Sequence, residues 1–136
     1  MLFRSWMFVQ SVGTKHFAGC SNGKICRLDD DVFQYSGAHL VRERTWPHMV
    51  SPSMEPVGYL GLELSMRTGY NGNVTLEISN DGGNTFGAPL LRSLGAVGRW
   101  MQRVRWLCLG TALNRVFRIR CSDNVPFAIY DAAVDT

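Results

Sequence analysis

The stretch that decides the fold reads Val74-Thr75-Leu76-Glu77-Ile78-Ser79-Asn80-Asp81-Gly82-Gly83-Asn84-Thr85-Phe86. Apolar and polar residues alternate over its first half, which predicts a strand with one buried and one solvated face. A turn is predicted next, because aspartate accepts hydrogen bonds from nearby backbone N–H groups and the paired glycines adopt positive φ. We therefore expect strand, turn and strand in that order.

The spacing Ser-x-Asp-x-Gly-x-x-Phe in this stretch resembles the Asp-box hairpin, whose last position is usually Trp. Asp81 is expected to bond to the backbone of its own turn, and Phe86 to fold back onto the preceding strand. This makes the motif a folding device first, with contact to a ligand as the alternative. The residues expected to form this structural turn are Ser79, Asp81, Gly82, Gly83, Thr85 and Phe86.

Length and composition fit one sizeable core with a small annex, because the chain has 136 residues, of which 46% are hydrophobic and 18% charged. No apolar run approaches the roughly 20 residues that span a bilayer, and no signal peptide is recognisable, so we expect no membrane span and synthesis in a cytoplasm. The four cysteines lack CxxC and zinc-finger spacing, which predicts reduced, mostly buried thiols and neither metal nor cofactor.

Three parts follow from the strand and turn signals. Residues 1–35 predict a β-hairpin annex with strands near 2–9, 16–20 and 24–28, and its Gly-Cys-Ser-Asn-Gly-Lys-Ile stretch resembles part of a propeller blade. Residues 36–55 predict a proline-rich linker with one short strand candidate at 39–46, because Pro47 and Pro52 are incompatible with a central strand or a long helix. Residues 56–135 predict the main domain.

The main domain is expected to be an antiparallel β-sandwich, so that the fold class is all-β. Short strands recur at near-regular spacing with turn residues between them, and no helix is indicated. The strand at 60–66 is expected to form a hairpin with the strand at 74–79 through Tyr70-Asn71-Gly72-Asn73.

Basic residues are concentrated between Leu90 and Ser122, where the chain carries seven arginines and no carboxylate. Strand parity predicts that four of them lie together on an outer face, which costs stability unless an acidic group offsets them. The offsetting acidic group would be a partner subunit, a phosphate, or Glu63 and Glu77 of the same chain. A solvated basic face without such a group is the simplest alternative. We prefer a subunit interface to contact with DNA. The four residues of this expected interface are Arg103, Arg105, Arg118 and Arg120.

Catalysis is not indicated. His16 and His39 lack a plausible Ser or Cys nucleophile nearby, and His48 is expected in an ordered loop. A sialidase-type glycosidase would need several Asp boxes and a catalytic pocket, so one box argues against it. A carbohydrate-binding or adhesion module stays open, because an exposed Trp46, Tyr70 or Trp100 would stack on sugar rings.

A longer set of motifs resembles a known family. Ser-Asn-Asp-Gly-Gly-Asn-Thr-Phe, Leu-Gly-x-x-Gly, Arg103-Val104-Arg105-Trp106, Arg115-Val116-Phe117-Arg118 and a closing Ala-Ile-x-x-Ala follow one another as in the C-terminal part of the packaged-DNA stabilisation protein of short-tailed phages. Arg42-x-Arg44-Thr45-x-Pro47-His48 and the upstream Asn22-Gly23-Lys24-Ile25 fit the same family. The chain departs at Phe86, where Trp is usual, and at Cys20 and Cys26, where Asp and an aromatic residue are expected.

The resemblance implies a structural protein of the virion tail, encoded by a phage or a prophage. It implies synthesis in the cytoplasm of the bacterial host. Members of the family act as tail accessory factors, or tail hubs, beneath the portal and its adaptor, and they prevent packaged DNA from escaping. No active site is required. The partners implied are further copies of the chain or other tail and portal-adaptor subunits, with non-specific contact to packaged DNA as a further option.

Overall fold

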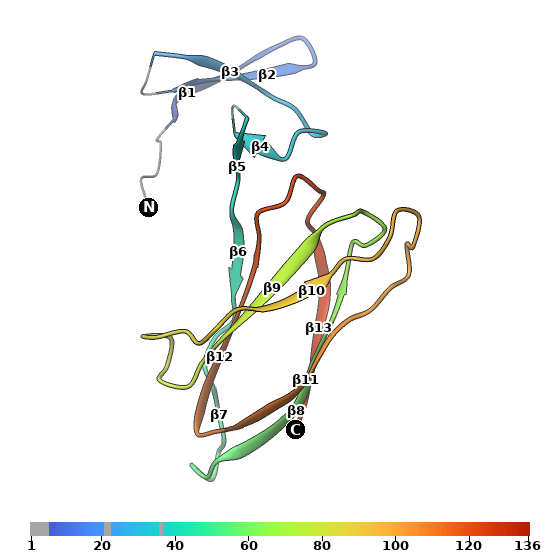
Figure 1. Cartoon of the computed structure of the whole chain (residues 1–136). Helices are drawn as coiled ribbons and strands as arrows, with labels where there is room; N and C mark the ends of the chain where they lie inside the picture. The colour runs from blue at the N-terminus through green and yellow to red at the C-terminus, as the bar shows by residue number, and fades with distance from the viewer. Residues whose placement is uncertain (1–5, 21–22, 36) are drawn as a thin grey trace. The chain divides into compact units, whose positions relative to one another are not determined.

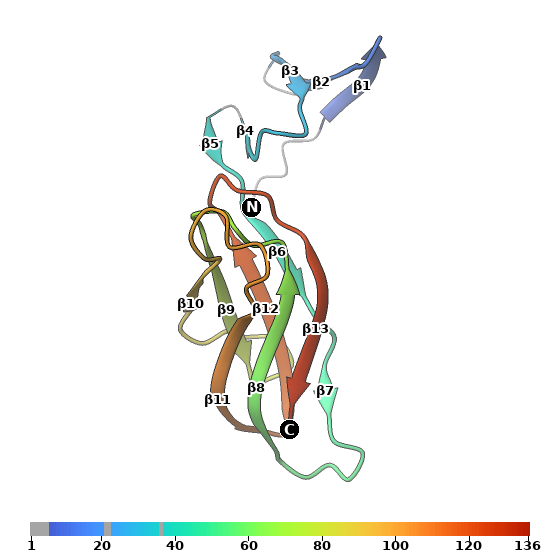
Figure 2. The ribbon, with the colours of Figure 1, turned by 90° about the vertical axis from the view of Figure 1, so that its right-hand side faces the viewer.

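The computed structural model describes residues 6–20, 23–35 and 37–136, and these form strands, turns and loops without a helix (Figures 1 and 2). The chain divides into two compact units, Met1–His39 and Leu40–Thr136. The strands are β1 (Trp6–Val12), β2 (Lys15–Cys20), β3 (Ile25–Leu28), β4 (Gln34–Tyr35), β5 (Ala38–His39), β6 (Arg42–Thr45), β7 (Met49–Val50), β8 (Val57–Met66), β9 (Asn73–Ser79), β10 (Leu90–Ser93), β11 (Val104–Ala112), β12 (Asn114–Cys121) and β13 (Ile129–Asp135).

The first unit is a small antiparallel sheet in the order β1-β2-β3, followed by the two-stranded β4-β5 ladder. The three predicted strands are therefore found, although residues 2–5 and Asn22 of those predictions lie outside the described residues. Among the residues whose burial is described, Ala18 and Cys20 form the buried apolar part of this unit. A turn follows β3 at Asp29, where the N–H of Val32 donates to the Asp29 carbonyl oxygen at 3.4 Å.

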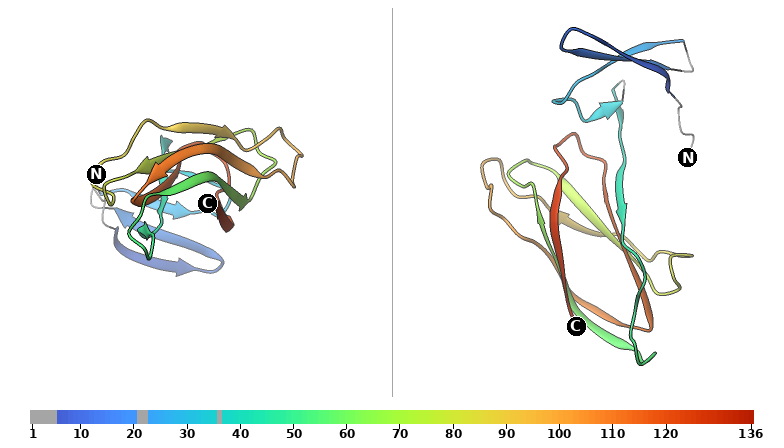
Figure 3. Two further views of the ribbon diagram at one scale, coloured as in Figure 1. Left: turned by 90° about the horizontal axis from the view of Figure 1, so that it is seen from below. Right: turned by 180° about the vertical axis from the view of Figure 1, so that it is seen from behind.

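The second unit is the β-sandwich predicted from the strand spacing (Figure 3). One sheet has the order β10-β9-β12-β6, with β7 also paired to β12, and the other has the order β11-β8-β13. Leu62, Leu64 and Trp106 of the three-stranded sheet are buried, as the period-2 alternation predicts. Val74, Leu76, Phe117 and Ile119 of the other sheet complete the same core.

The segment predicted as a linker supplies strands to this sandwich. β6 pairs antiparallel with β12 in the register Arg118↔Thr45, and β7 pairs with the start of the same strand. Pro47 lies between β6 and β7 and so is outside both ladders, where its missing N–H removes no ladder hydrogen bond. The segment therefore differs from the expected linker, because prolines between short edge strands are compatible with pairing.

The predicted hairpin between the strands at 60–66 and 74–79 is wrong. β8 pairs with β11 and β13, whereas β9 pairs with β10 and β12, so the chain crosses from one sheet to the other between Met66 and Asn73. Both strands still bury alternate side chains in the common core, because they face each other across the sandwich and do not share an edge. Alternation indicates the buried face of a strand but not its hydrogen-bonded neighbour.

A β-bulge interrupts β11 opposite β8. The ladder register shifts between Leu107 and Gly110, and Cys108 has a φ of 58°, which is uncommon for a residue other than glycine. The extra residue breaks the alternation of inside and outside positions after Leu107. Cys108 is consequently exposed and Leu109 is buried, whereas strand parity predicts that Cys108 lies inside.

Candidate functional site: the Asp-box turn and the arginine pairs

The turn after β9 is held by the side chains of Ser79 and Asp81. The Ser79 hydroxyl donates to Asp81 Oδ1 at 2.6 Å and accepts the Gly83 N–H at 2.8 Å. The Thr85 N–H lies 2.9 Å from both carboxylate oxygens of Asp81, and the Thr85 hydroxyl donates to Oδ2 at 2.5 Å. These hydrogen bonds all return to the turn itself, which is the arrangement expected of an Asp box.

The same contacts stabilise the ionised form of Asp81. Hydrogen bonds from the Ser79 hydroxyl, the Thr85 hydroxyl and the Thr85 backbone lower the pKa of this carboxyl well below its ordinary value of 3.8. The lowered pKa has a local cause in the turn. It does not by itself indicate a ligand, because structural hydrogen bonds perturb pKa values as functional sites do.

Phe86, the last residue of the motif, lies against an arginine of the neighbouring strand. The Arg118 Cζ atom is 3.6 Å from the centroid of the Phe86 ring. Arg118 is paired in register with Glu77 of β9, and its Nε donates to Glu77 Oε2 at 2.6 Å. The turn thus places Phe86 beside the ion pair that joins β9 to β12, with its ring against the arginine of β12.

Gly82 allows the turn to approach two residues from distant parts of the sandwich. A Cβ atom at this position would lie 3.0 Å from His48 Cε1 and 3.2 Å from Asn114 Nδ2, and its φ is 75°. His48 Nδ1 is in turn 3.2 Å from Asn114 Oδ1. The Asp-box turn therefore packs beside the β6–β7 loop and the start of β12.

Arg103 and Arg105 share one carboxylate on the three-stranded sheet. Arg105 Nε lies 2.7 Å from Glu63 Oε2, and Arg103 Nη1 lies 3.1 Å from Glu63 Oε1. Arg105 and Glu63 are direct neighbours in the β11–β8 register. The Arg103 side chain is still 76% exposed, so this group keeps an accessible positive charge.

Arg118 and Arg120 are paired on the other sheet. Both contact Glu77, and Arg120 Nε also lies 3.3 Å from Glu43 Oε2 on β6. The Arg118 and Glu77 side chains are only 22% and 12% exposed, so this pair is better shielded from solvent than the pairs of Glu63. Charge between β9, β12 and β6 is therefore balanced within the chain.

The expectation that the four arginines form one outer face is wrong. β11 and β12 follow each other in the sequence but belong to different sheets, so Arg103 and Arg105 are separated from Arg118 and Arg120 by the core. Of the acidic partners considered, the structure shows the two glutamates. Glu63 pairs with Arg103 and Arg105, and Glu77 pairs with Arg118 and Arg120. Contact of either arginine pair with another molecule stays a prediction.

Two further arginines bind backbone carbonyl groups and were not singled out from the sequence. Arg115 is buried, donates from Nη1 to the Leu109 carbonyl at 2.7 Å, and lies 4.5 Å from the Tyr59 ring centroid. Burial lowers the pKa of its guanidinium. Arg115 and Phe117 are two residues apart on β12 and therefore lie on the same face of the strand. This spacing was the sequence signal for the burial of Arg115. Arg42 similarly donates to the Asp123 and Val125 carbonyls and fixes the loop before β13.

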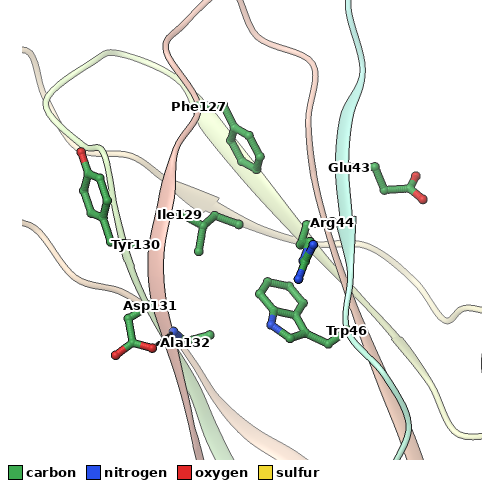
Figure 4. Close-up of a pocket in the computed structure, with 8 residues that line it drawn as sticks. All are labelled: Glu43, Arg44, Trp46, Phe127, Ile129, Tyr130, Asp131 and Ala132. Carbon is green, nitrogen blue, oxygen red and sulfur yellow. Dashed lines mark hydrogen bonds between the residues drawn. The ribbon is translucent and has the colours of Figure 1, made fainter.

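A groove of about 520 Å³ lies between β6 and β13 (Figure 4). Trp46, Phe127 and Ile129 line it, together with Arg44, whose Cζ is 6.0 Å from the Trp46 ring centroid. Its carboxylates are already engaged in part, because Glu43 pairs with Arg120 and Asp131 accepts the N–H of Ala132. The groove is a mixed apolar and charged surface without a convergent set of reactive groups.

Histidine contacts correct one expectation of the sequence. Ser11 Oγ lies 2.7 Å from His16 Nδ1 across the β1–β2 ladder, although no such neighbour was expected. Both residues are exposed, and no carboxylate of the described residues bonds to this imidazole. Within the described ranges there is also no group of three or more His, Cys, Asp or Glu side chains suited to a metal ion. No helix there is long and apolar enough to cross a membrane.

The family model described as "Bacteriophage P22 Gp10, beta-sandwich" matches residues 46–136, which is nearly all of the second unit. No curated protein matches the chain. The family match agrees with the two-sheet architecture and confirms the phage family expected from the order of the sequence motifs. The chain therefore belongs to the P22 Gp10 β-sandwich family and is a bacteriophage virion structural protein.

Proposed function

We propose that the chain is a subunit of the phage tail hub, where it helps to close the portal channel and retain packaged DNA. The observation that carries this proposal is the family match across residues 46–136, because it covers nearly all of the sandwich and not a single motif. The proposed location is the tail of the virion, after synthesis in the cytoplasm of the bacterial host. The proposed role is structural and not enzymatic.

The arrangement of charge supports a role in contacts between proteins. Glu43, Glu63 and Glu77 pair with arginines of the same chain, so the sandwich does not present a wide unneutralised surface to DNA. One group with an excess of positive charge lies at β10 and β11, where Arg103 and Arg105 share Glu63 and Arg92 donates to the Arg105 carbonyl. We assign this group, defined as Arg92, Arg103 and Arg105, to a contact with an acidic surface of a neighbouring tail or portal-adaptor subunit.

Deleting the gene from the phage or prophage that encodes the chain tests the function directly. We expect particles that package DNA but lose it, measured as a rise in nuclease-sensitive DNA, and we expect complementation to restore retention. The chain should also be found in purified wild-type particles by mass spectrometry. Particles that hold nuclease-resistant DNA without the chain would contradict the proposal.

A second experiment separates a protein contact from a DNA contact at the β10–β11 group. Arg92→Gln combined with Arg103→Gln removes two charges and leaves the Arg105–Glu63 pair in place. We expect weaker association between subunits and little change in duplex binding at physiological salt. If the group contacts DNA instead, duplex affinity falls with salt by a log–log slope near 0.9 per phosphate, and the double variant reduces that slope.

Carbohydrate binding is the alternative function, and exposure of Trp100 is the observation that favours it. This side chain is 59% exposed and lines a hollow with Arg99, Met101 and Gln102. Stacking on a sugar would use such an aromatic face. Binding of the purified chain to a glycan array, abolished by Trp100→Ala, would support this alternative, and an array without signal would contradict it.

A further inference from the structure

The loop between β10 and β11 exposes large apolar side chains on the second unit. Val97, Trp100 and Met101 are 78%, 59% and 96% exposed, and they lie within five residues of one another. A single exposed apolar residue is ordinary, but a group of large ones on one loop is typical of an interaction surface. We call residues 95–102 the apolar loop.

Contacts with a buried threonine fix the backbone of this loop. Thr68 is 1% exposed, and its hydroxyl lies 3.1 and 3.0 Å from the carbonyl oxygens of Arg99 and Trp100 and 3.3 Å from the Gln102 nitrogen. The Gly98 N–H also donates to the Gly69 carbonyl at 3.1 Å. The apolar side chains are therefore held on an ordered backbone, which reduces the entropy cost of binding.

The orientation of Trp100 is fixed by its neighbours as well. Its ring packs on Gly69, where a Cβ atom would lie 2.5 Å from Trp100 Cε3, and it meets the Tyr70 ring edge-on with centroids 5.4 Å apart. Arg67 lies over the Tyr70 ring, with its Cζ atom 5.5 Å from the ring centroid. Trp, Tyr, Met and Arg are the residues enriched at the energetic centres of protein interfaces.

The charge of this surface is positive. Arg67 and Arg99 are exposed, and neither forms an ion pair within the described ranges. The apolar loop and the preceding segment 67–73 contain no Asp or Glu. A complementary partner therefore needs exposed carboxylates beside apolar side chains.

The first unit of the same protein offers that combination. Asp30 and Asp31 are exposed and form no ion pair within the described part of the chain, and Val32, which follows them, is 56% exposed. We call residues 29–32 the acidic turn. It is opposite in charge to the apolar loop, and Val32 gives it an exposed apolar side chain.

We propose that the apolar loop of one copy binds the acidic turn of a second copy, with Arg67 and Arg99 facing Asp30 and Asp31. This contact joins two different surfaces, so it passes from copy to copy and builds a ring when the rotation closes. The inference rests on the proposed role as a tail-hub subunit, which requires self-association, and it identifies the surfaces that associate.

Charge reversal in the full chain tests the contact by light scattering coupled to size exclusion. Arg67→Glu with Arg99→Glu, and separately Asp30→Arg with Asp31→Arg, are each expected to raise the concentration at which the oligomer dissociates by about tenfold or more. All four changes together should restore association. Lys15→Glu with Arg44→Glu is the matched control, because it reverses two exposed charges elsewhere and should leave the mass unchanged.

Met101→Ala tests the apolar part of the contact and should weaken association without changing the unfolding curve, since the side chain is 96% exposed. An oligomer that survives both charge reversals unchanged would overturn this contact while leaving the tail-hub function intact. A wild-type chain that is monomeric at high micromolar concentration would overturn self-association and this contact together. Binding of the apolar loop to anionic vesicles, lost with Trp100→Ala while the oligomer persists, would reassign the loop to a lipid surface.

Discussion

The Phe86 ring covers the Arg118 guanidinium, with 3.6 Å between the ring centroid and Arg118 Cζ. Arg118 also bonds to Glu77 of the adjacent strand. An aromatic ring at the end of the turn after β9 therefore shields the ion pair that joins β9 to β12. This relationship links a local turn motif to the pairing of two central strands.

Replacing Phe86 tests that link. Phe86→Ala removes a cation–π contact and the shielding of the ion pair, and we expect a loss of about 1–2 kcal/mol in the free energy of unfolding, measured by urea denaturation. Phe86→Trp should retain or increase stability, because indole is the stronger cation–π partner. A Phe86→Ala variant as stable as the wild type would show that the ring contributes nothing to the pair.

Ser79 supplies the acceptor for a backbone N–H of the turn. Ser79→Ala leaves the Gly83 N–H without this acceptor in a buried position, which is expected to cost about 1–3 kcal/mol. Ser53→Ala is the control, because Ser53 forms its hydrogen bond in an exposed turn and its loss should be within about 0.5 kcal/mol. Equal effects of the two changes in thermal and urea unfolding would contradict a structural role for Ser79.

Stability should fall in acid through Asp81. The pKa of its carboxyl is lowered in the folded chain from an ordinary value of 3.8, so its contribution is fully present above about pH 4. The contribution is lost as the pH falls from there toward the lowered folded value, because protonation then favours the unfolded chain. Asp81→Asn should remove this part of the acid dependence, and it should leave subunit association at pH 7 unchanged. Lost association with an unchanged melting temperature would instead identify Asp81 as a binding residue.

The two glycines of the turn have different requirements. Gly82→Ala and Gly83→Ala both force a Cβ onto positive φ, at 75° and 93°, but only the former also approaches His48 at 3.0 Å. We expect both variants to lose about 1 kcal/mol from backbone strain, with a further loss for Gly82→Ala. His48→Ala should reduce the difference between them in urea denaturation, and the remainder reflects the approach to Asn114 Nδ2 at 3.2 Å. Indistinguishable single variants would show that the turn moves away from His48 at no cost.

Much of the sandwich was predictable from the sequence, because alternation locates strands and their buried faces. Leu62 and Leu64 on β8, and Val74 and Leu76 on β9, are buried as predicted. The pairing of β8 with β9 was wrong, since a strand facing another across a core shows the same alternation as one beside it. The same ambiguity applies to β11 and β12, whose arginines strand parity wrongly placed on one face.

Features that depend on a single residue were harder to predict. The bulge at Cys108 has no distinctive local sequence, yet it breaks the alternation of β11, so that Cys108 is exposed and Leu109 is buried. Pro47 suggested a linker because proline is excluded from central strands, but β6 and β7 end and begin on either side of it. The turn motif was the easiest part of the candidate site to locate, because its hydrogen bonds are all local.

Exposure of Cys108 leads to a test of the bulge. Cys108 is exposed, whereas Cys121 is buried and burial raises the pKa of its thiol. We expect iodoacetamide at neutral pH to modify Cys108 well before Cys121, because the thiolate is the reactive form and less of it is present when the pKa is raised. Peptide mass spectrometry after limited alkylation measures the order. Faster modification of Cys121 would contradict the register of β11.

The crossing between β8 and β9 has a consequence for how the protein folds. β8 forms its ladders with β11 and β13, both far along the chain, so few of its contacts are local. Folding rates fall as the sequence separation of contacting residues rises. During synthesis the sheet of β8 cannot be completed until β13 has been made, and exposed apolar side chains of an incomplete sheet favour aggregation in that interval.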